Sequence, residues 1–283
     1  MAPRPQRERT SPLLLTIALF CALAVLPLGG FAQTAKRGAI MFAINEGATT
    51  QVTVVELIDR YTPLARFVER ALGHPVKLEV FPEIARFRAE LDHDRCDVIF
   101  GKTVNALAGA VRDKKFHAVV KTKNPYIAGF IITKDSTIRT PEDLRGKIIM
   151  LPEKVFTTKL AEAMLRDLGI KQSEVKLQYT RLQEVVAHSV EIGTADVGVV
   201  NPTVKRQWEK QGNVVLLETK PVPNWTIVAS PRFSQAEVRR LRAVMVELKS
   251  SAQGERALKA IGVTEFVPAT DAEYIELLNY IGE

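Results

Sequence analysis

Short apolar runs alternate with amphipathic stretches from residue 37 onward. Apolar runs of this length are typical of buried β-strands, and apolar positions three or four residues apart are typical of helices that cover a sheet. Residues 38–44 and 76–81 are expected strands on either side of one such helix, which should end at Gly73, a suitable C-terminal cap. The apolar face of this helix comprises Leu57, Tyr61, Leu64, Ala65, Val68 and Leu72. The alternation predicts an α/β protein.

The alternation continues as two similar sets of elements. The expected strands lie at 97–100, 117–121, 126–133, 148–151, 175–179 and 197–200, and the expected helices at 85–91, 105–111, 158–168 and 182–192. The apolar face of helix 158–168 comprises Leu160, Met164, Leu165 and Leu168. In each set a residue pair, Cys96-Asp97 or Ala195-Asp196, opens a buried strand. This likeness favours two lobes built in the same way.

The domain organisation follows from the end of the chain. After residues 214–228 the pattern shows helices around 236–249, 254–261 and 271–280, with no further strand. A helical tail is placed most economically back on the first lobe. The predicted fold therefore has two lobes, each a mostly parallel sheet flanked by helices, with two hinge crossings near 123–127 and 221–226. The predicted boundaries are 37–124 plus 225–283 for lobe 1 and 125–224 for lobe 2.

The first 32 residues differ from the rest. Three arginines precede an uncharged apolar stretch over 13–28, and Gly30-Phe31-Ala32 is a small-x-small cleavage site. This is the pattern of a signal peptide and predicts export to the periplasm. The apolar stretch is long enough that an uncleaved anchor is the alternative. Cys21 follows bulky Phe20, which is unlike a lipid-modified cysteine.

The composition favours some classes of protein and argues against others. The 283 residues are 46% hydrophobic and 25% charged, as in globular proteins. Without residues 1–32 the chain carries 36 basic and 31 acidic residues, spread along its length. The densest basic stretch comprises Lys114, Lys115, Lys121 and Lys123, and no aromatic residues interleave to stack on bases. We therefore expect no nucleic-acid partner. Cys96 is then the single cysteine, expected to be a buried small hydrophobe without a disulfide.

Catalytic and metal-binding patterns are not found in the sequence. The chain has no GxSxG motif, no glycine-rich phosphate loop and no histidine beside Cys96. The four histidines, His74, His93, His117 and His188, lie on separate expected elements without ligand spacing. We therefore expect no enzyme activity, no metal and no cofactor, although a hydrolase or transferase on the same fold stays an alternative.

Several segments together resemble the type II periplasmic solute-binding proteins of ABC transporters. They are Tyr61-Thr-Pro-Leu-Ala, Leu72-Gly73, Cys96-Asp-Val-Ile-Phe-Gly101, Lys134-Asp-Ser136, Pro141-Glu-Asp-Leu-Arg-Gly-Lys147, the segment 191–201 and Pro221-Val-Pro-Asn224. Their order and spacing are similar to those of the phosphonate, phosphite and phosphate group and its sulfonate and transferrin-like relatives. The resemblance implies a ligand in the cleft between the lobes and a membrane permease as partner.

The ligand motif departs from that family. Phosphonate binders carry Ser-Thr-Ser just before a second-lobe helix, where hydroxyls and helix N-terminal amides hold an anion. Here those positions are Lys154, Val155 and Phe156, and the family's tyrosine and histidine correspond to Ile84 and Gln183. Thr157 and Thr158 follow directly and can either cap the helix or contact the ligand.

Polar residues in the loops after strands should face the cleft, because ligands in such folds lie at the carboxyl ends of the strands. The candidate ligand-binding residues are Asn45, Glu46, Lys102, Thr103, Asn105, Tyr126, Lys154, Thr157, Thr158, Gln183 and Asn201. Tyr126 and Trp225, at the two crossings, can stack on a ligand or brace the hinge.

The sequence thus predicts a periplasmic component of an ABC importer that works as a monomer. Its small ligand is either a phosphonate- or phosphate-like anion, attracted by Lys154, or a neutral molecule held by amides. The alternative is a sensor that presents its bound state to a membrane receptor.

Overall fold

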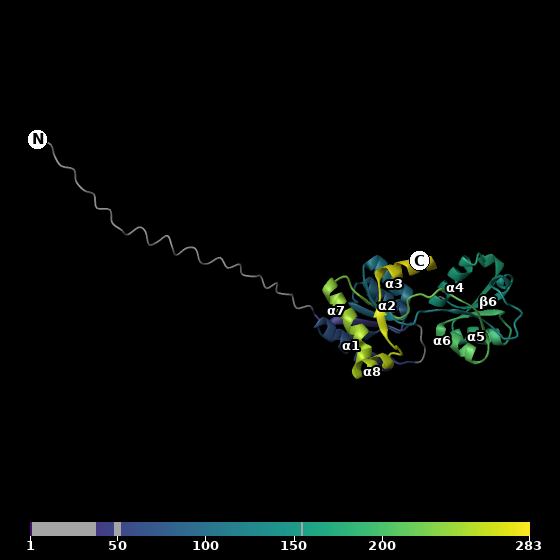
Figure 1. Ribbon diagram of the computed structural model, residues 1–283, viewed down its shortest axis with the longest axis horizontal. Coiled ribbons are helices and arrows are strands. Elements are labelled where there is room, and N and C mark those ends of the chain that lie inside the picture. The colour runs from purple at the N-terminus through teal and green to yellow at the C-terminus, as the bar shows by residue number, and fades with distance from the viewer. Residues whose placement is uncertain (2–37, 48–51, 154) are drawn as a thin grey trace. The chain divides into compact units, whose positions relative to one another are not determined.

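The computed structural model describes Met1 and residues 38–47, 52–153 and 155–283. Residues 2–32 of the predicted signal peptide and Lys154 lie outside this part of the chain. Within it the chain forms two sheets flanked by helices (Figure 1). The predicted α/β fold class is confirmed.

The first lobe is built on a six-stranded sheet of order β11-β4-β10-β3-β1-β2. Its strands are β1 (Ile40–Asn45), β2 (Val76–Val80), β3 (Val98–Gly101), β4 (His117–Thr122), β10 (Thr226–Ala229) and β11 (Phe266–Pro268). Its helices are α1 (Val54–Leu72), α2 (Ile84–Asp92), α3 (Val104–Lys114), α7 (Gln235–Val246), α8 (Ala252–Ala260) and α9 (Asp271–Ile281), with the 3-10 turn η3 (Glu247–Ser250). Strands β1 to β4 run in one direction, and β10 and β11 run against them.

The second lobe is built on a five-stranded sheet of order β7-β6-β8-β5-β9. Its strands are β5 (Gly129–Ile132), β6 (Ile148–Pro152), β7 (Lys176–Thr180), β8 (Val197–Val200) and β9 (Val214–Glu218). Its helices are α4 (Phe156–Asp167), α5 (Gln183–Glu191) and α6 (Pro202–Lys210), with 3-10 turns η1 (Pro141–Leu144) and η2 (Gln172–Glu174). Only β5 runs against the other four strands.

Alternation along the strands explains how each sheet is covered on both faces. In β1, Ile40, Phe42 and Ile44 pack in one cluster with α1, α7 and α8, and Ala43 packs in another with α2, α3 and α9. Because successive strand residues point to opposite faces, one buried strand serves two cores. Helices α3 and α9, far apart in the sequence, lie side by side on the second face (Figure 1).

Helix α1 forms where its apolar spacing predicts. All six residues of its predicted face are buried, and Gly73 ends the helix with φ of 71°. Thr53 begins it, because its hydroxyl accepts from the Glu56 amide and the Glu56 carboxylate accepts from the Thr53 amide. The helix therefore begins and ends at residues suited to those positions.

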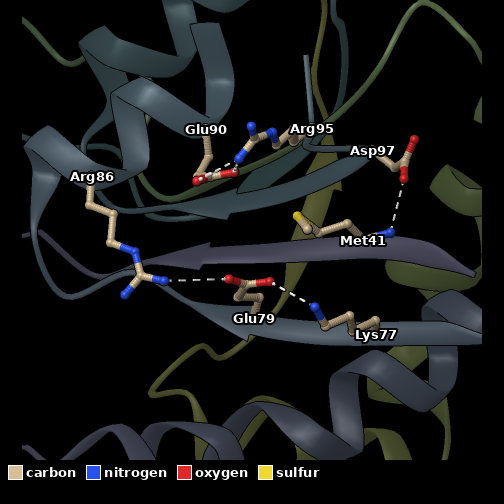
Figure 2. A network of polar contacts seen from close by, with 7 residues as sticks. All are labelled: Met41, Lys77, Glu79, Arg86, Glu90, Arg95 and Asp97. Atoms are coloured by element: carbon tan, nitrogen blue, oxygen red, sulfur yellow. Dashed lines mark hydrogen bonds and ion pairs between the residues drawn. The ribbon is translucent and has the colours of Figure 1, made fainter. Parts of the chain in front are cut away.

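The two lobes share one type of hydrogen bond, made by the aspartate of the pairs Cys96-Asp97 and Ala195-Asp196. The Asp97 carboxylate accepts from the Met41 amide at 2.9 Å, and the Asp196 carboxylate accepts from the Ile148 amide at 2.8 Å. Figure 2 shows the first of these bonds, beside the ion pairs that the partly buried Glu79 and Glu90 make with exposed lysine and arginine side chains. In both lobes the aspartate thus joins the start of one parallel strand to its neighbour.

The later part of the chain contains two elements that the sequence pattern does not predict, one helix and one strand. Helix α6 was not predicted, although Asn201 accepts from the Thr203 and Val204 amides at 2.9 Å and Pro202 follows as the first helical residue. Strand β11 pairs with β4 within the helical tail, where no strand was expected. β11 has only three residues and ends in Pro268, so no apolar alternation reveals it.

The helical tail packs against first-lobe elements. Helix α7 contacts α1 and β4, α8 contacts α1, and α9 contacts α3. Tyr126 and Val222 form an isolated bridge where the two crossings pass each other. The domain boundaries given above stay a prediction.

Cys96 lies at 0% exposure within the core of the first lobe. Burial raises the pKa of its thiol to about 12, with the nearby Glu90 and Asp97 carboxylates adding to the effect. Because the thiolate is the nucleophile, we expect Cys96 to resist iodoacetamide at pH 8 in the folded protein and to react fully in denaturant. Mass spectrometry of both samples checks this. Rapid labelling without denaturant would show that the thiol is accessible.

Candidate ligand-binding site

The candidate residues of the first lobe lie together at the carboxyl ends of β1 and β3. Asn45 is fully buried, and its amide donates to the Phe81 carbonyl at 2.9 Å. Its carbonyl oxygen accepts from the Thr103 hydroxyl at 2.9 Å and from the Gly47 amide at 3.2 Å. Asn45 therefore ties together the loops that follow three strands.

Glu46 and Lys102 form a buried ion pair next to the hydrogen bonds of Asn45. Their side chains are 5% and 15% exposed, and the Lys102 Nζ lies 3.2 Å from the Glu46 carboxylate. The other Glu46 oxygen accepts from the Tyr61 hydroxyl at 2.6 Å and lies 3.4 Å from the Arg60 guanidinium. Burial lowers the pKa of Lys102, an effect that Glu46 opposes. These charges are largely occupied with one another.

Trp225 braces this cluster from the second crossing. The Lys102 Nζ lies 3.9 Å from the centroid of the indole ring, and Phe100 meets the ring edge-on at 6.5 Å. Of the two roles considered for Trp225, the contacts support the structural one, because one face of the ring is already covered by a cation. Sequence reasoning did not assign Arg60 and Tyr61 to the site, since both belong to a helix with an ordinary apolar stripe.

A chain of hydrogen bonds joins the candidate residues of the second lobe. The Tyr126 hydroxyl lies 2.6 Å from the Thr157 Oγ1, which also accepts from the Gln183 amide at 3.2 Å. The Gln183 carbonyl oxygen in turn accepts from the Asn201 backbone amide at 3.0 Å. Tyr126 comes from the first crossing, and the other three residues lie at the starts of α4, α5 and α6. The chain therefore brings three helix N-termini to one place.

The residues joined by these hydrogen bonds still have donors that are not used. Tyr126 and Thr157 share one bond, so one of their two hydroxyl hydrogens has no acceptor within the described residues. Burial raises the pKa of Tyr126 to about 12, which keeps its hydroxyl protonated. One N–H of Gln183 and the side-chain amide nitrogen of Asn201 likewise donate to no described residue. Such a surface suits a ligand rich in acceptor atoms.

The N-termini of α4 and α5 also favour a ligand with acceptor atoms. Val155 and Leu182 precede α4 and α5, and neither side chain accepts from the first-turn amides. Uncapped amides at a helix N-terminus attract negative charge. Thr158 does not take part, because its hydroxyl donates to the Pro152 carbonyl.

Asn105 and Lys154 complete the set of predicted residues. Asn105 lies on α3, where its amide donates to the Glu283 carboxylate at 3.2 Å, so it is not joined to the Asn45 cluster. Lys154, the predicted cation, is outside the described residues. Phe156, which follows it closely in the sequence, packs edge-on against Tyr126 with ring centroids 5.2 Å apart.

A separate groove lies along the two crossings and α9. It has a volume of about 570 Å³. Its walls comprise Lys121, Thr122, Lys123, Pro125, Lys220, Pro221, Val222, Pro223, Asn224, Glu273, Glu276, Leu277 and Tyr280. None of the candidate ligand residues lines it, so we do not identify it with the ligand site.

Within the described residues, no helix combines the length and apolarity needed to span a bilayer. No curated protein matches the sequence significantly.

Solved structures of low sequence identity share the fold. A Xanthomonas citri protein bound to ATP is 17% identical, with 87% of this chain and 98% of that chain covered and a TM-score of 0.69. The binding-protein component of an ABC phosphonate transporter from Pseudomonas aeruginosa is also 17% identical, covering 86% of this chain and 85% of its own, with a TM-score of 0.60. PhnD1 from Prochlorococcus marinus, in complex with methylphosphonate, is 14% identical over 84% of this chain and 96% of its own, with a TM-score of 0.62.

Comparison with protein families identifies the chain directly. Residues 47–274 match the family described as the periplasmic substrate-binding protein of phosphonate ABC transporters. The match covers the second sheet, every strand of the first sheet except β1, and both crossings. The resemblance seen in the sequence is thereby confirmed, and the chain belongs to this family of periplasmic solute-binding proteins.

Proposed function

We propose that this solute-binding protein captures a small oxyanion of the phosphonate or sulfonate type between its lobes. The observation that carries the proposal is the set of unused donors at the Tyr126–Thr157 pair, Gln183 and Asn201, beside the uncapped start of α4. Phosphonate and sulfonate groups are compact and present several acceptor oxygens, which match such donors. The family and the methylphosphonate bound by PhnD1 support the same class.

The first lobe supplies the opposite wall of the proposed site. Its Glu46 carboxylate is engaged by both Lys102 and Arg60, so this wall offers mainly shape and a rigid loop framework. A ligand that contacts both walls stabilises the closed arrangement by its differential affinity for it. The lobes, proposed as 37–124 plus 225–283 and 125–224, move about the two crossings.

The remaining parts of the proposal follow from the sequence. Residues 1–32 direct export to the periplasm, and the protein acts there as a monomer that delivers its ligand to a membrane permease. The family supports delivery to a permease.

The test is isothermal titration of the protein lacking residues 1–32 with methylphosphonate, phosphate, sulfate and methanesulfonate. We expect at least one to bind, and Gln183→Ala to weaken it about 10- to 100-fold, because a hydrogen bond to a charged group is lost. Gln211→Ala is the matched control and should leave affinity unchanged, because Gln211 is exposed and lies at the C-terminal end of α6, away from Asn201. Equal affinity in Gln183→Ala and the wild type would place the ligand elsewhere.

A further inference from the structure

Helix α4 belongs to the core of both lobes. It follows β6, and its residues Ala161 and Leu165 pack in the cluster of the second lobe. Phe156 and Leu160 pack instead in the cluster formed by α2, α3 and α9 of the first lobe. Leu160 is fully buried there and Phe156 is 8% exposed. The sequence predicts one apolar face for Leu160, Met164, Leu165 and Leu168. The last three pack in or against the second-lobe cluster, and only the placement of Leu160 on that face is wrong.

The two faces follow from helix geometry. Phe156 and Leu160 are four residues apart and so lie on one stripe, and Ala161 and Leu165 form a second stripe rotated by one residue. Met164, four residues after Leu160, packs against the second-lobe cluster, so the apolar contact with the first lobe is made by the first turns of α4. An amphipathic pattern shows that both stripes are apolar, and it does not show that they meet different partners. The helix therefore acts as a shared wall between two cores.

Polar contacts also join the end of α4 to α9 and to the second crossing. The Arg166 guanidinium donates to the Tyr280 carbonyl of α9 and lies 5.9 Å from its ring. Asp167 binds Lys220 of the second crossing at 2.6 Å, and the Lys220 Nζ lies 4.9 Å from the same ring. The lobes are thus joined by α4 and α9 as well as by the two crossings.

The same helix carries a donor of the ligand site. Phe156 contacts the Tyr126 ring, and the Tyr126 hydroxyl is bonded to Thr157, the next residue of α4. The packing of Phe156 on the first lobe therefore fixes where the Thr157 hydroxyl and its Gln183 partner lie. A change in this packing would move the donors without touching them.

We propose that Phe156 and Leu160 are positioning residues that anchor α4 to the first lobe. The anchor makes the two lobes unfold as one cooperative unit and holds the start of α4 in place for ligand binding. The effect on affinity rests on the function proposed above, whereas the effect on cooperativity is independent of any ligand.

Scanning calorimetry of the protein lacking residues 1–32 tests the anchor. We expect the wild type to unfold in one transition, with equal calorimetric and van't Hoff enthalpies. The double variant Phe156→Ala/Leu160→Ala should unfold in two transitions. Leu165→Ala, in the same helix and buried in the second lobe alone, should lower the midpoint by roughly 5 to 15 °C and keep one transition. A single transition in the double variant, or two in the wild type, would overturn the proposal.

Single substitutions at Phe156 separate positioning from loss of packing and serve if the double variant does not fold. Phe156→Ser should split or broaden the transition and weaken methylphosphonate about tenfold, and Phe156→Leu should restore both properties. Leu165→Ala should change affinity by less than about twofold. Unchanged cooperativity in Phe156→Ser refutes the anchor. If the wild type binds no anion, the proposed function fails and calorimetry still decides the anchor.

Discussion

Replacing Glu46 by glutamine is expected to lower the free energy of unfolding by about 3 kcal/mol, because the substitution leaves the Lys102 ammonium buried without its counter-charge. The remaining contact of Lys102 with the Trp225 ring offsets only part of this cost. Glutamine keeps an oxygen that can accept from the Tyr61 hydroxyl, so the variant removes charge while keeping shape. For a chain of this size the melting temperature should fall by roughly 6 to 12 °C.

The matched control is Glu90→Gln, which removes the ion pair with Arg95 shown in Figure 2, a pair that is open to solvent at the 59% exposed Arg95 and has Glu90 at 21%. Exposed pairs contribute at most about 1 kcal/mol, so this variant should unfold almost like the wild type. The double variant Glu46→Gln/Lys102→Met should recover part of the lost stability, since it leaves no unpaired charge. Urea unfolding of the four proteins measures these differences. If Glu46→Gln loses no more stability than Glu90→Gln, the buried pair has no structural importance.

Asn45→Ala is expected to cost about 3 to 5 kcal/mol. The substitution removes hydrogen bonds to the Phe81 carbonyl, the Thr103 hydroxyl and the Gly47 amide, and each buried partner left unpaired costs roughly 1 to 3 kcal/mol. Because these partners follow three different strands, the loss loosens the whole carboxyl edge of the first sheet.

Asn279→Ala is the control for this substitution, since Asn279 is an exposed residue of α9. It should change stability by no more than about 0.5 kcal/mol. Urea unfolding of both variants, read by circular dichroism, gives the comparison. Stability of Asn45→Ala equal to that of Asn279→Ala would mean that the three loops are held by other contacts.

Much of the fold can be predicted from the sequence because it depends on local pattern. Short apolar runs locate β1 and β3, and the spacing in α1 gives its buried face and its end at Gly73. The Asp97 and Asp196 pair indicates the repeat, since both residues precede a buried strand. Helix α6 could also have been predicted from Asn201 and Pro202. It was missed because its short apolar stripe, Val204 and Trp208, lies among charged residues.

The site is harder to predict because its contacts join distant residues. The sequence places Glu46 and Lys102 in loops that face the cleft, and it does not show that they neutralise each other. Neither does it reveal that Tyr126 bonds Thr157 across the hinge. An apolar stripe such as that of α4 predicts that the residues are buried, and it does not show which element covers them. Phe156 and Leu160 could therefore not be assigned to the first lobe.

Small-angle X-ray scattering during a titration with the tightest-binding anion tests the central claim most directly. If the ligand is held between the lobes by the second-lobe donors, the radius of gyration should fall and level off at the ligand concentration that saturates binding. The double variant Thr157→Val/Gln183→Ala should show no such change at that concentration. Saturable binding with an unchanged radius of gyration, or an undiminished response in the double variant, would contradict the proposed site between the lobes.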